Sequence, residues 1–346
     1  LSTVGSIIGT FGPAFWLVPA IGTRATVLLF AGLLFTVVLV GLGGVRLGVL
    51  GLLPLALGWW VSKQPVKVSK GLIAEAESQY QYIQVIETPD RQQRMLRFDH
   101  GRTVQSRERA ATPFTSGYWD WVFPLPNLST APRPKVLILG FAAGTIARGI
   151  VETRDEGAVE LTGVELDDKV VDFARRYFSA GRLGSRMKIE VEDARVYLTR
   201  SNERFDLILL DVYANESYVP PHLVTREFFE VVREHLAPGG LLVANVNAPR
   251  SDSLLLTSFF KTLEAVFSNV ESLQREGTWN RELIASVGPL DWAGAASRMP
   301  PSLSGTWANT LQMRTPADSR GGMLLTDDRA PVELLTDAQV FAERKE

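Results

Sequence analysis

The stretch KVLILGFAAGTIARGI, residues 135–150, decides the fold class of this chain. Residues 135–140 form an apolar run, small residues follow, and a segment of helical character extends over about 144–154. A buried strand that enters a helix through a tight turn is the shape of a nucleotide-binding loop, because the helix N-terminus offers free N–H groups to a ligand. The turn keeps only Gly140 and Gly144, so it has less glycine than most loops of this kind.

Strands and helices alternate along the chain after this turn. Strands are expected at 159–166, 187–192, 205–211, 241–246, 270–275 and 282–287. Helices are expected at 168–178, from 194 onward, at 225–236 and at 253–267. The alternation predicts an α/β fold with a Rossmann-like, doubly wound and mainly parallel sheet. A PGG turn is expected at 238–240, and the tail after Gly288 is expected to be irregular except near 324–335.

A smaller β-rich unit precedes this α/β part. The segment YQYIQVIET (80–88) alternates apolar and polar residues, as a half-buried strand does. MLRFD (95–99) and TVQSR (103–107) read as two more strands, and TSGYWDWVFPLP (115–126) predicts a short helix that ends at prolines.

The beginning of the chain is strongly apolar. Residues 25–44 are about 20 uncharged residues, enough to cross a hydrocarbon core of ~30 Å as a helix. Residues 45–61 are a shorter second candidate, and 4–22 are a third, broken by Pro13 and Pro19. Since the chain begins with Leu, we expect it to be a fragment of a longer membrane protein.

Basic residues predict the orientation of these segments. Lys63, Lys67 and Lys70 closely follow the last apolar segment, so the positive-inside rule places that end in the cytoplasm. Arg24 then lies inside and Arg46 outside. We therefore expect a multi-pass protein of the inner (cell) membrane with a cytoplasmic catalytic domain.

Composition excludes several classes of function. The chain has 346 residues, a formal net charge of −2, no cysteine and three scattered histidines. The balanced charge gives no reason to expect a nucleic-acid partner. Disulfides, thiolate metal sites and cysteine nucleophiles are excluded, and no metal site is expected.

Together these patterns divide the chain into four parts. They are a transmembrane helical segment at 1–62, a linker at 63–70, a small β-rich domain at 71–126 and a Rossmann-like transferase domain at 127–346.

Acidic side chains stand at the ends of successive predicted strands: Glu165, Asp193 and Asp211. In open α/β sheets ligands bind at the carboxyl ends of the strands, so these acids and the turn at Gly140 are expected to surround one ligand. Glu165 is placed to accept hydrogen bonds from ribose hydroxyls, and Asp193 to meet an adenine amino group. Asp167 and Asp193 can equally cap the helices that follow them. The pattern predicts an adenosyl-type ligand.

The chain carries the motifs ESQYQYIQV (77–85), VELD (164–167), EDAR (192–195), FDLILLD (205–211) and LTDDRAPVE (325–333). These motifs resemble those of one known family, the spermidine synthase-like (polyamine aminopropyltransferase) family, and the resemblance implies that the fold is of the class I S-adenosylmethionine-transferase type. The resemblance covers roughly 70–345, and it is closest to bacterial members fused to membrane helices. The apolar start of the chain looks like a transporter-like helix segment of those fused proteins.

The resemblance implies an activity in polyamine biosynthesis. The donor is decarboxylated S-adenosylmethionine, an acceptor amine attacks its aminopropyl carbon, and methylthioadenosine leaves. Asp211 matches the family's base position, and Gln81 matches a glutamine that contacts the donor. The other expected donor-binding positions are Gly140, Gly144, Glu165, Asp193 and Ala194.

The chain departs from the family where amines are recognised. Ala143 stands where the family's glycine-rich loop has an aspartate, and Ala214 stands where a second acid usually follows the fourth strand. Each lost charge-assisted hydrogen bond is worth roughly 1.5–3 kcal/mol. The side chains that can compensate are Tyr118, Asp120, Tyr213, Glu216 and Tyr218, of which Tyr118, Tyr213 and Glu216 are assigned to the substrate.

Two other functions stay open. An S-adenosylmethionine-dependent methyltransferase shares the sheet order and the ribose and adenine acids, and a non-catalytic ligand-binding domain coupled to a transporter-like membrane part keeps only the fold. Trp119 and Trp121 fit either a lid or dimer contact or ordinary packing. The expected partners are a small-molecule amine, the membrane through the N-terminal helices, and further copies of the chain in a homo-oligomer, but no nucleic acid.

Overall fold

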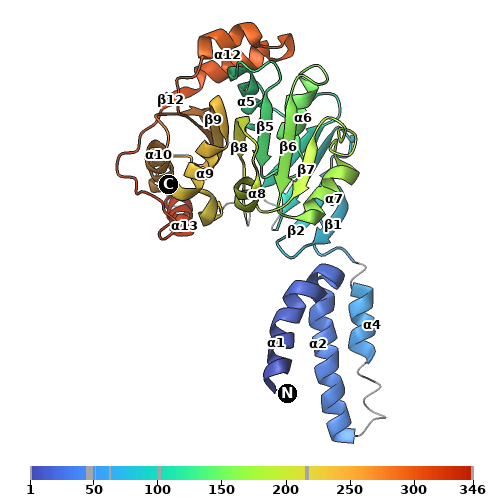
Figure 1. Cartoon of the computed structure of the whole chain (residues 1–346). Helices are drawn as coiled ribbons and strands as arrows, with labels where there is room; N and C mark the ends of the chain where they lie inside the picture. The colour runs from blue at the N-terminus through green and yellow to red at the C-terminus, as the bar shows by residue number, and fades with distance from the viewer. Residues whose placement is uncertain are drawn as a thin grey trace.

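The apolar run at 135–139 forms the strand β5 (Lys135–Leu139) in the middle of a large sheet. The computed structural model describes residues 2–43, 50, 52–61, 64–99, 103–214 and 218–343. Within these residues the sheet has eight strands in the order β12-β10-β11-β9-β8-β5-β6-β7 (Figure 1). The other strands are β6 (Glu160–Glu165), β7 (Lys188–Val191), β8 (Phe205–Leu210), β9 (Leu236–Asn247), β10 (Asn269–Gln274), β11 (Asn280–Ser286) and β12 (Arg314–Pro316). Strands β5 to β9 pair in parallel, and β10, β11 and β12 add antiparallel pairs at one edge.

Helices cover both faces of this sheet because alternate residues of its strands are apolar on both sides. Val136 and Ile138 of β5 belong to one buried cluster, and Leu137 and Leu139 belong to another on the opposite face. The main helices are α6 (Thr145–Glu152), α7 (Asp168–Tyr177), α8 (Ala194–Arg200), α9 (Arg226–Glu234) and α10 (Leu254–Glu264). The predicted doubly wound, mainly parallel fold is therefore confirmed.

The β-rich unit is a four-stranded antiparallel sheet in the order β1-β2-β3-β4. Its strands are β1 (Leu72–Glu77), β2 (Tyr82–Glu87), β3 (Gln93–Phe98) and β4 (Val104–Arg109). The first of them was not predicted, because the β1 side chains are only half-buried and LIAEAE lacks a strong apolar alternation. The predicted short helix after this sheet is split into α5 (Trp119–Val122) and a 3₁₀ turn, Leu125–Leu128.

Two expectations about the second half of the chain are wrong. The PGG segment does not separate a helix from a strand, because β9 runs through it as one strand. Gly240 lies so close to the neighbouring strand that a Cβ there would lie 2.9 Å from the carbonyl oxygen of Phe205. The tail is also more regular than expected: it forms α11 (Trp292–Ala295), α12 (Ser304–Gln312), β12 and α13 (Val332–Glu343). Tertiary packing makes these elements, since the rings of Trp292 and Trp307 stack with their centroids 5.5 Å apart.

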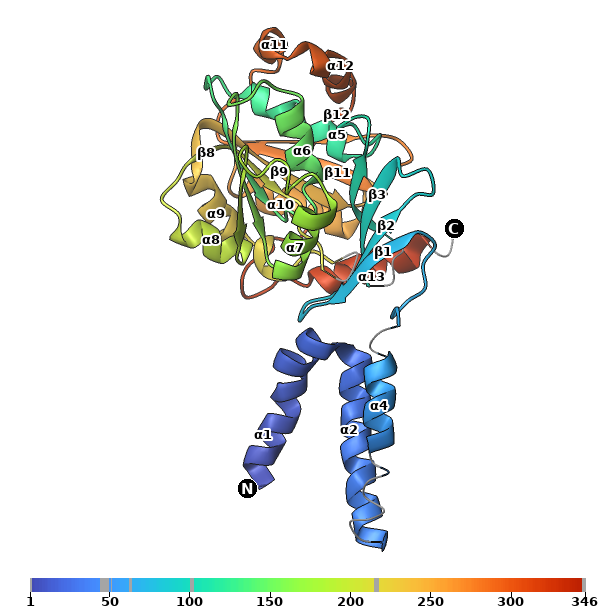
Figure 2. The ribbon, with the colours of Figure 1, turned by 90° about the vertical axis from the view of Figure 1, so that its right-hand side faces the viewer.

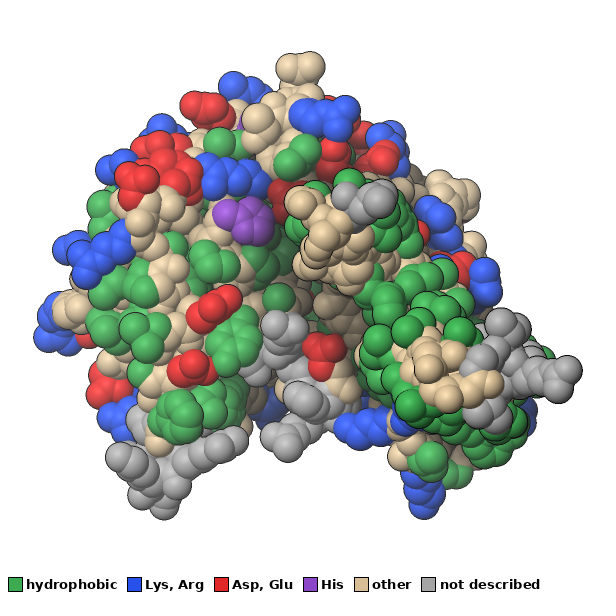
Figure 3. Space-filling view, turned by 90° about the horizontal axis from the view of Figure 1, so that it is seen from below, with side chains coloured by type: hydrophobic (Ala, Val, Ile, Leu, Met, Phe, Trp, Pro, Cys, Tyr) green, Lys and Arg blue, Asp and Glu red, His purple; other side chains and the backbone are tan. Residues whose placement is uncertain are grey.

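The N-terminal segment projects from the globular part as a group of helices (Figure 2). They are α1 (Ser2–Gly12), a π-helical turn (Pro13–Leu17), α2 (Val18–Gly43) and α4 (Leu52–Val61). Within the helical run Ser2–Gly43, a stretch of 18 residues reaches a mean hydropathy of 2.6, and the run is long and apolar enough to cross a membrane. In the space-filling view from below, hydrophobic side chains gather on these helices (Figure 3).

The break in this run does not fall where it was expected. Helical structure continues through Pro13 and Pro19, and the non-helical residue is Gly22 (φ 82°, ψ 162°). A glycine reaches this backbone conformation without a steric penalty, so it takes the bend in place of the prolines. Of the predicted segment 45–61, residues 45–49 and 51 lie outside the described residues.

One acid joins the helices to the β-rich unit. The Glu77 carboxylate at the end of β1 accepts hydrogen bonds from the Thr23 amide and hydroxyl, both at 2.7 Å. The Arg24 guanidinium donates to the carbonyls of Pro65 and Val66. The end of α2 that carries Arg24 therefore lies against the globular part.

Candidate active site

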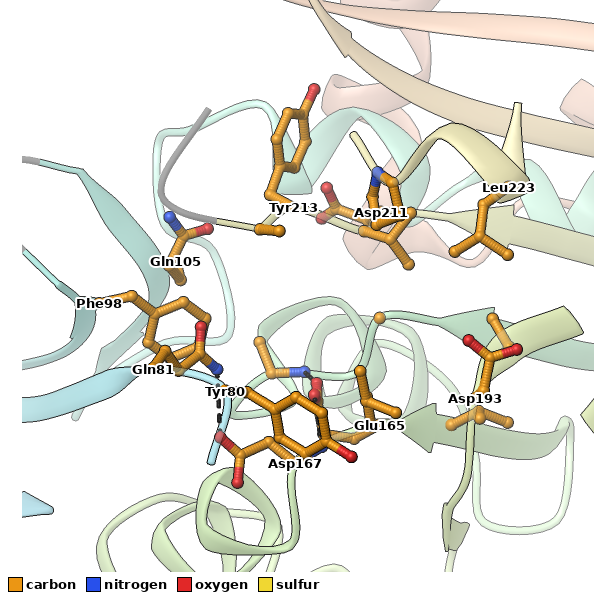
Figure 4. Close-up of a pocket in the computed structure, with 18 of the residues that line it drawn as sticks. Tyr80, Gln81, Phe98, Gln105, Glu165, Asp167, Asp193, Asp211, Tyr213 and Leu223 are labelled. Atoms are coloured by element: carbon orange, nitrogen blue, oxygen red, sulfur yellow. Dashed lines mark hydrogen bonds between the residues drawn. The ribbon is translucent and has the colours of Figure 1, made fainter. Parts of the chain in front are cut away.

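A cavity of about 260 Å³ lies at the carboxyl ends of the parallel strands. The turn between β1 and β2 contributes Tyr80 and Gln81 to its wall, so both sheets form the site (Figure 4). The predicted residues that line it are Gln81, Tyr118, Gly140, Glu165, Asp193, Ala194, Asp211 and Tyr213. Residues that sequence reasoning did not assign to the site also line it: Tyr80, Phe98, Gln105, His222 and Leu223.

The loop after β5 needs glycine for close packing. Gly140 has a φ of +90°, and a Cβ there would lie 2.2 Å from the Asp211 carbonyl oxygen. Gly144 has a φ of +82° and caps α6, where a Cβ would meet the Phe141 ring at 2.6 Å. Phe141 thus fills the space over the loop, and Gly144 supports the loop without lining the cavity. Ala142 takes a positive φ of 48° although it is not glycine.

Glu165 closes the loop from the end of β6. Its Oε2 accepts a hydrogen bond from the Ala142 amide at 2.8 Å, and its Oε1 accepts one from the Asp167 amide at 3.2 Å. Burial raises the pKa of Glu165 to about 7, against the opposing effect of these backbone donors. A carboxylate in this position can accept hydrogen bonds from a pair of hydroxyl groups in the cavity.

Asp167 joins the two sheets beneath the cavity. Its Oδ1 caps α7 by accepting from the Lys169 amide at 3.0 Å. Its Oδ2 accepts from the Ser78 hydroxyl at 2.5 Å and from Gln81 Nε2 at 3.4 Å, the contact drawn in Figure 4. Burial raises the pKa of Asp167. Gln81 is therefore held at the cavity wall by an acid of the larger sheet.

Asp193 caps the helix that follows β7. Its Oδ1 accepts hydrogen bonds from the amides of Arg195 and Val196 at 2.9 and 3.0 Å. Its Oδ2 lies 3.1 Å from Nε2 of His222. The capping interpretation of this residue holds in the structure, and Ala194, the first residue of α8, lines the cavity beside it.

Asp211 follows β8 and is the acid at the centre of the site. Its Oδ1 accepts from Asn245 Nδ2 at 2.7 Å, and its Oδ2 accepts from the Tyr118 hydroxyl at 3.0 Å. Burial raises the pKa of Asp211 to about 6, while these two donors lower it. Burial and the negative charge of Asp211 raise the pKa of the Tyr118 hydroxyl, so Tyr118 stays a donor. Such an acid can accept a proton near neutral pH.

Tyr213 lines the cavity with its ring, but its hydroxyl is engaged elsewhere. The hydroxyl donates to the Asn245 carbonyl at 3.1 Å and accepts from the Asn247 amide at 2.8 Å. Tyr213 therefore braces the loop after β8 against β9.

Two of the remaining compensating candidates, Asp120 and Tyr218, do not line the cavity. Asp120 accepts hydrogen bonds from the Thr115 and Ser116 amides, and the Tyr218 hydroxyl donates to Asp337 at 2.6 Å. Glu216 lies outside the described residues. Trp119 and Trp121 are buried in the core, 5% and 6% exposed, which agrees with ordinary packing.

Two polar residues near Asp211 were missed by sequence reasoning. Asn245 of β9 holds the Asp211 carboxylate, and Glu282 of β11 is 1% exposed. Burial, followed by the negative charge of Asp211, raises the pKa of Glu282 well above its usual range. The sequence signal for each of them was a polar residue within an otherwise apolar strand: Asn245 in LLVANV (241–246) and Glu282 in RELIAS (281–286).

The comparisons with known proteins agree on one family. A family model described as the spermine/spermidine synthase domain matches residues 117–275. A probable polyamine aminopropyl transferase of Bifidobacterium longum is 30% identical over 286 residues, or 76% of this chain, and the chain spans only 62% of that protein's length. A polyamine aminopropyltransferase of Vibrio vulnificus is 27% identical over 279 residues, which cover 76% of this chain and 91% of that protein.

Solved structures agree on the fold. A probable spermidine synthase from Corynebacterium glutamicum matches with a TM-score of 0.60 and 21% identity, over 75% of this chain and 97% of that one. The spermidine synthase from Thermotoga maritima matches with a TM-score of 0.53 and 20% identity, over 77% of this chain and 83% of that one.

Proposed function

We propose that this chain is a member of the spermidine synthase-like family and a transferase that moves the aminopropyl group of decarboxylated S-adenosylmethionine to an amine. The observation that carries the proposal is the placement of Asp211. It stands at the end of β8, held by Tyr118 and Asn245, in a cavity whose opposite wall carries Glu165.

The donor's nucleoside would lie between the ends of β6 and β7. Glu165 would accept hydrogen bonds from the ribose hydroxyls, and the adenine would lie beside Asp193 and Ala194. Gln81, held by Asp167, would contact the donor from the β-rich unit. Gly140 lets the backbone approach the ligand closely.

Asp211 would act as the base. An alkyl amine has a solution pKa near that of lysine, ~10, so it arrives protonated and must lose a proton before it attacks. Asp211 would hold this ammonium and take one of its protons, which frees the lone pair for attack on the aminopropyl carbon. The C–S bond to the sulfonium breaks as the C–N bond forms, and its electron pair leaves with sulfur as neutral methylthioadenosine.

We further propose that the N-terminal helices anchor this domain on the cytoplasmic side of the inner membrane. The helical run Ser2–Gly43 is long enough to span it. Arg24, Lys67 and Lys70 lie at the end nearest the globular part, as the positive-inside rule requires for a cytoplasmic domain. Family resemblance also implies a homo-oligomer, which light scattering in detergent would measure.

A transfer assay with the full chain in detergent tests the proposed function. The enzyme is given putrescine with either decarboxylated S-adenosylmethionine or S-adenosylmethionine, and the products are identified by mass spectrometry. We expect spermidine and methylthioadenosine from the first donor, and their loss in Asp211→Asn. A methylated product from S-adenosylmethionine, with no spermidine from the other donor, would contradict the proposal.

A further inference from the structure

Glu282 is a buried acid with an unpaired carboxyl oxygen. It lies on β11, only 1% exposed, and its Oε1 has no hydrogen-bond partner among the described residues. A buried polar atom without a partner destabilises a fold, so such atoms are rare unless they have a function.

The register of the sheet places Glu282 in one row with Asp211. Leu210 of β8 pairs in parallel with Ala244 of β9, so Asp211 and Asn245 are the next pair along. Asn245 in turn lies directly opposite Glu282 of β11. Side chains at paired positions point to the same face of a sheet. The three side chains therefore form a row across adjacent strands.

The length of this row suits a molecule with two charged ends. Two strand spacings of ~4.8 Å place the backbones of Asp211 and Glu282 ~10 Å apart. A charge-assisted hydrogen bond of ~2.8 Å at each acid leaves roughly 4 Å between two bound nitrogens. That is the span of a short alkyl diamine.

We propose that Glu282 is the second amine-binding carboxylate of this site, holding the distal nitrogen of a di- or polyamine whose reacting nitrogen meets Asp211. The inference rests on the proposed function. Glu282 supplies a carboxylate in a chain that has Ala143 and Ala214 where the family has acids. It lies on β11, a strand that none of the sequence motifs includes. The substrate class is a linear amine with at least two charged nitrogens.

Binding at Glu282 requires a change in the groups around it. Glu282 does not line the cavity itself, and the groups that interact electrostatically with it are Asp211, Tyr118 and Tyr213. The amine displaces both the Tyr118 hydroxyl and the Asn245 amide from Asp211 as it enters the row. Since burial keeps the Glu282 carboxyl protonated, an arriving ammonium ion releases one proton to form the ion pair.

Calorimetry on the full chain in detergent tests the proposal. The protein is saturated with methylthioadenosine and titrated with putrescine or 1-butylamine in two buffers of different ionisation enthalpy. We expect putrescine to bind the wild type at least ~10-fold more tightly than the monoamine. In Glu282→Gln this preference disappears and one fewer proton is released per amine bound.

Two further variants separate function from folding. Glu271→Gln, on the neighbouring strand β10, removes an acid that pairs with Arg314 instead, and should leave amine binding unchanged. The buried Glu282 carboxyl destabilises the folded protein at pH 7, because its pKa is raised in the folded state. Glu282→Leu removes this carboxyl, so the Tm should rise by ~2–4 °C. The preference for the diamine over the monoamine should be lost in the same variant.

Each result bears on the inference separately from the proposed function. Glu282-dependent diamine binding without spermidine formation would support the amine site and count against aminopropyl transfer. Wild-type diamine affinity in Glu282→Gln would overturn the inference. Methylthioadenosine binding with no diamine binding to the wild type would overturn it as well.

Discussion

The affinity for the nucleoside is expected to fall as the pH is lowered, because of Glu165. Its carboxylate already faces backbone donors of the loop, and burial raises its pKa to about 7 in the free protein. Ribose hydroxyls donate to the ionised carboxylate, so binding favours the charged form and lowers this pKa. Binding therefore releases a proton, and it weakens as the pH falls through the pKa of the free protein.

The size of the effect follows from that pKa. With a pKa of about 7, the ionised fraction of Glu165 is about nine-tenths at pH 8 and about one-tenth at pH 6. If only the ionised form binds, the Kd for methylthioadenosine rises about tenfold between these two pH values, which is about 1.4 kcal/mol. Methylthioadenosine carries no aliphatic amine, so it does not engage the acceptor end of the site at Asp211.

Calorimetry at pH 6, 7 and 8 measures this dependence, and buffers of different ionisation enthalpy count the released protons. Glu165→Gln is the matched control, because it keeps the shape but cannot ionise. It should bind roughly tenfold to a hundredfold more weakly, with no dependence on pH over this range. A wild-type Kd that stays constant, or decreases as the pH falls, would exclude the ionised Glu165 carboxylate as the group that binds the ribose.

The other predictions concern the base, the loop and the helix junction. Asp211→Asn should lower the kcat of transfer by ~10²–10⁴ and leave the affinity for methylthioadenosine unchanged. The rate of the wild-type enzyme should fall as the pH drops below about 6, because Asp211 then takes up a proton. If the variant keeps the wild-type kcat, Asp211 is not the base. Gly140→Ala should lower the Tm by several degrees or prevent folding, because the new Cβ would lie 2.2 Å from the Asp211 carbonyl oxygen; an unchanged Tm would show that the loop can relax. Glu77→Ala removes both hydrogen bonds to Thr23 and should speed proteolytic cleavage between the helices and the globular part, whereas equal cleavage rates would mean that this junction depends on other contacts.

Strand-end positions are the part of the site that a sequence exposes most directly. Glu165 is the last residue of β6, while Asp193 and Asp211 follow β7 and β8, and parallel strands bring such ends to one edge of the sheet. The structure collects all three around one cavity. Their roles toward a donor or an amine stay predictions, because no ligand contact follows from position alone.

Residues brought together by strand register could not be predicted in the same way. Glu282 and Asn245 are far apart in the chain and meet only because β9 and β11 pair antiparallel in one specific register. Each stands within an otherwise apolar strand, where it reads as an isolated irregularity. The tail after Gly288 was misjudged for a related reason, since Trp292 and Trp307 order it by packing on each other and not by local periodicity.

The central claim is that the group transferred is the aminopropyl chain and that Asp211 promotes the transfer. The most direct measurement is mass spectrometry of the amine after incubation of the full chain with putrescine and a donor carrying deuterium in its aminopropyl carbons. We expect the deuterium to appear in spermidine and the methylthioadenosine to be unlabelled, and we expect Asp211→Asn to abolish the formation of both products. Deuterium that remains on the nucleoside, with the amine unchanged or methylated, would contradict it.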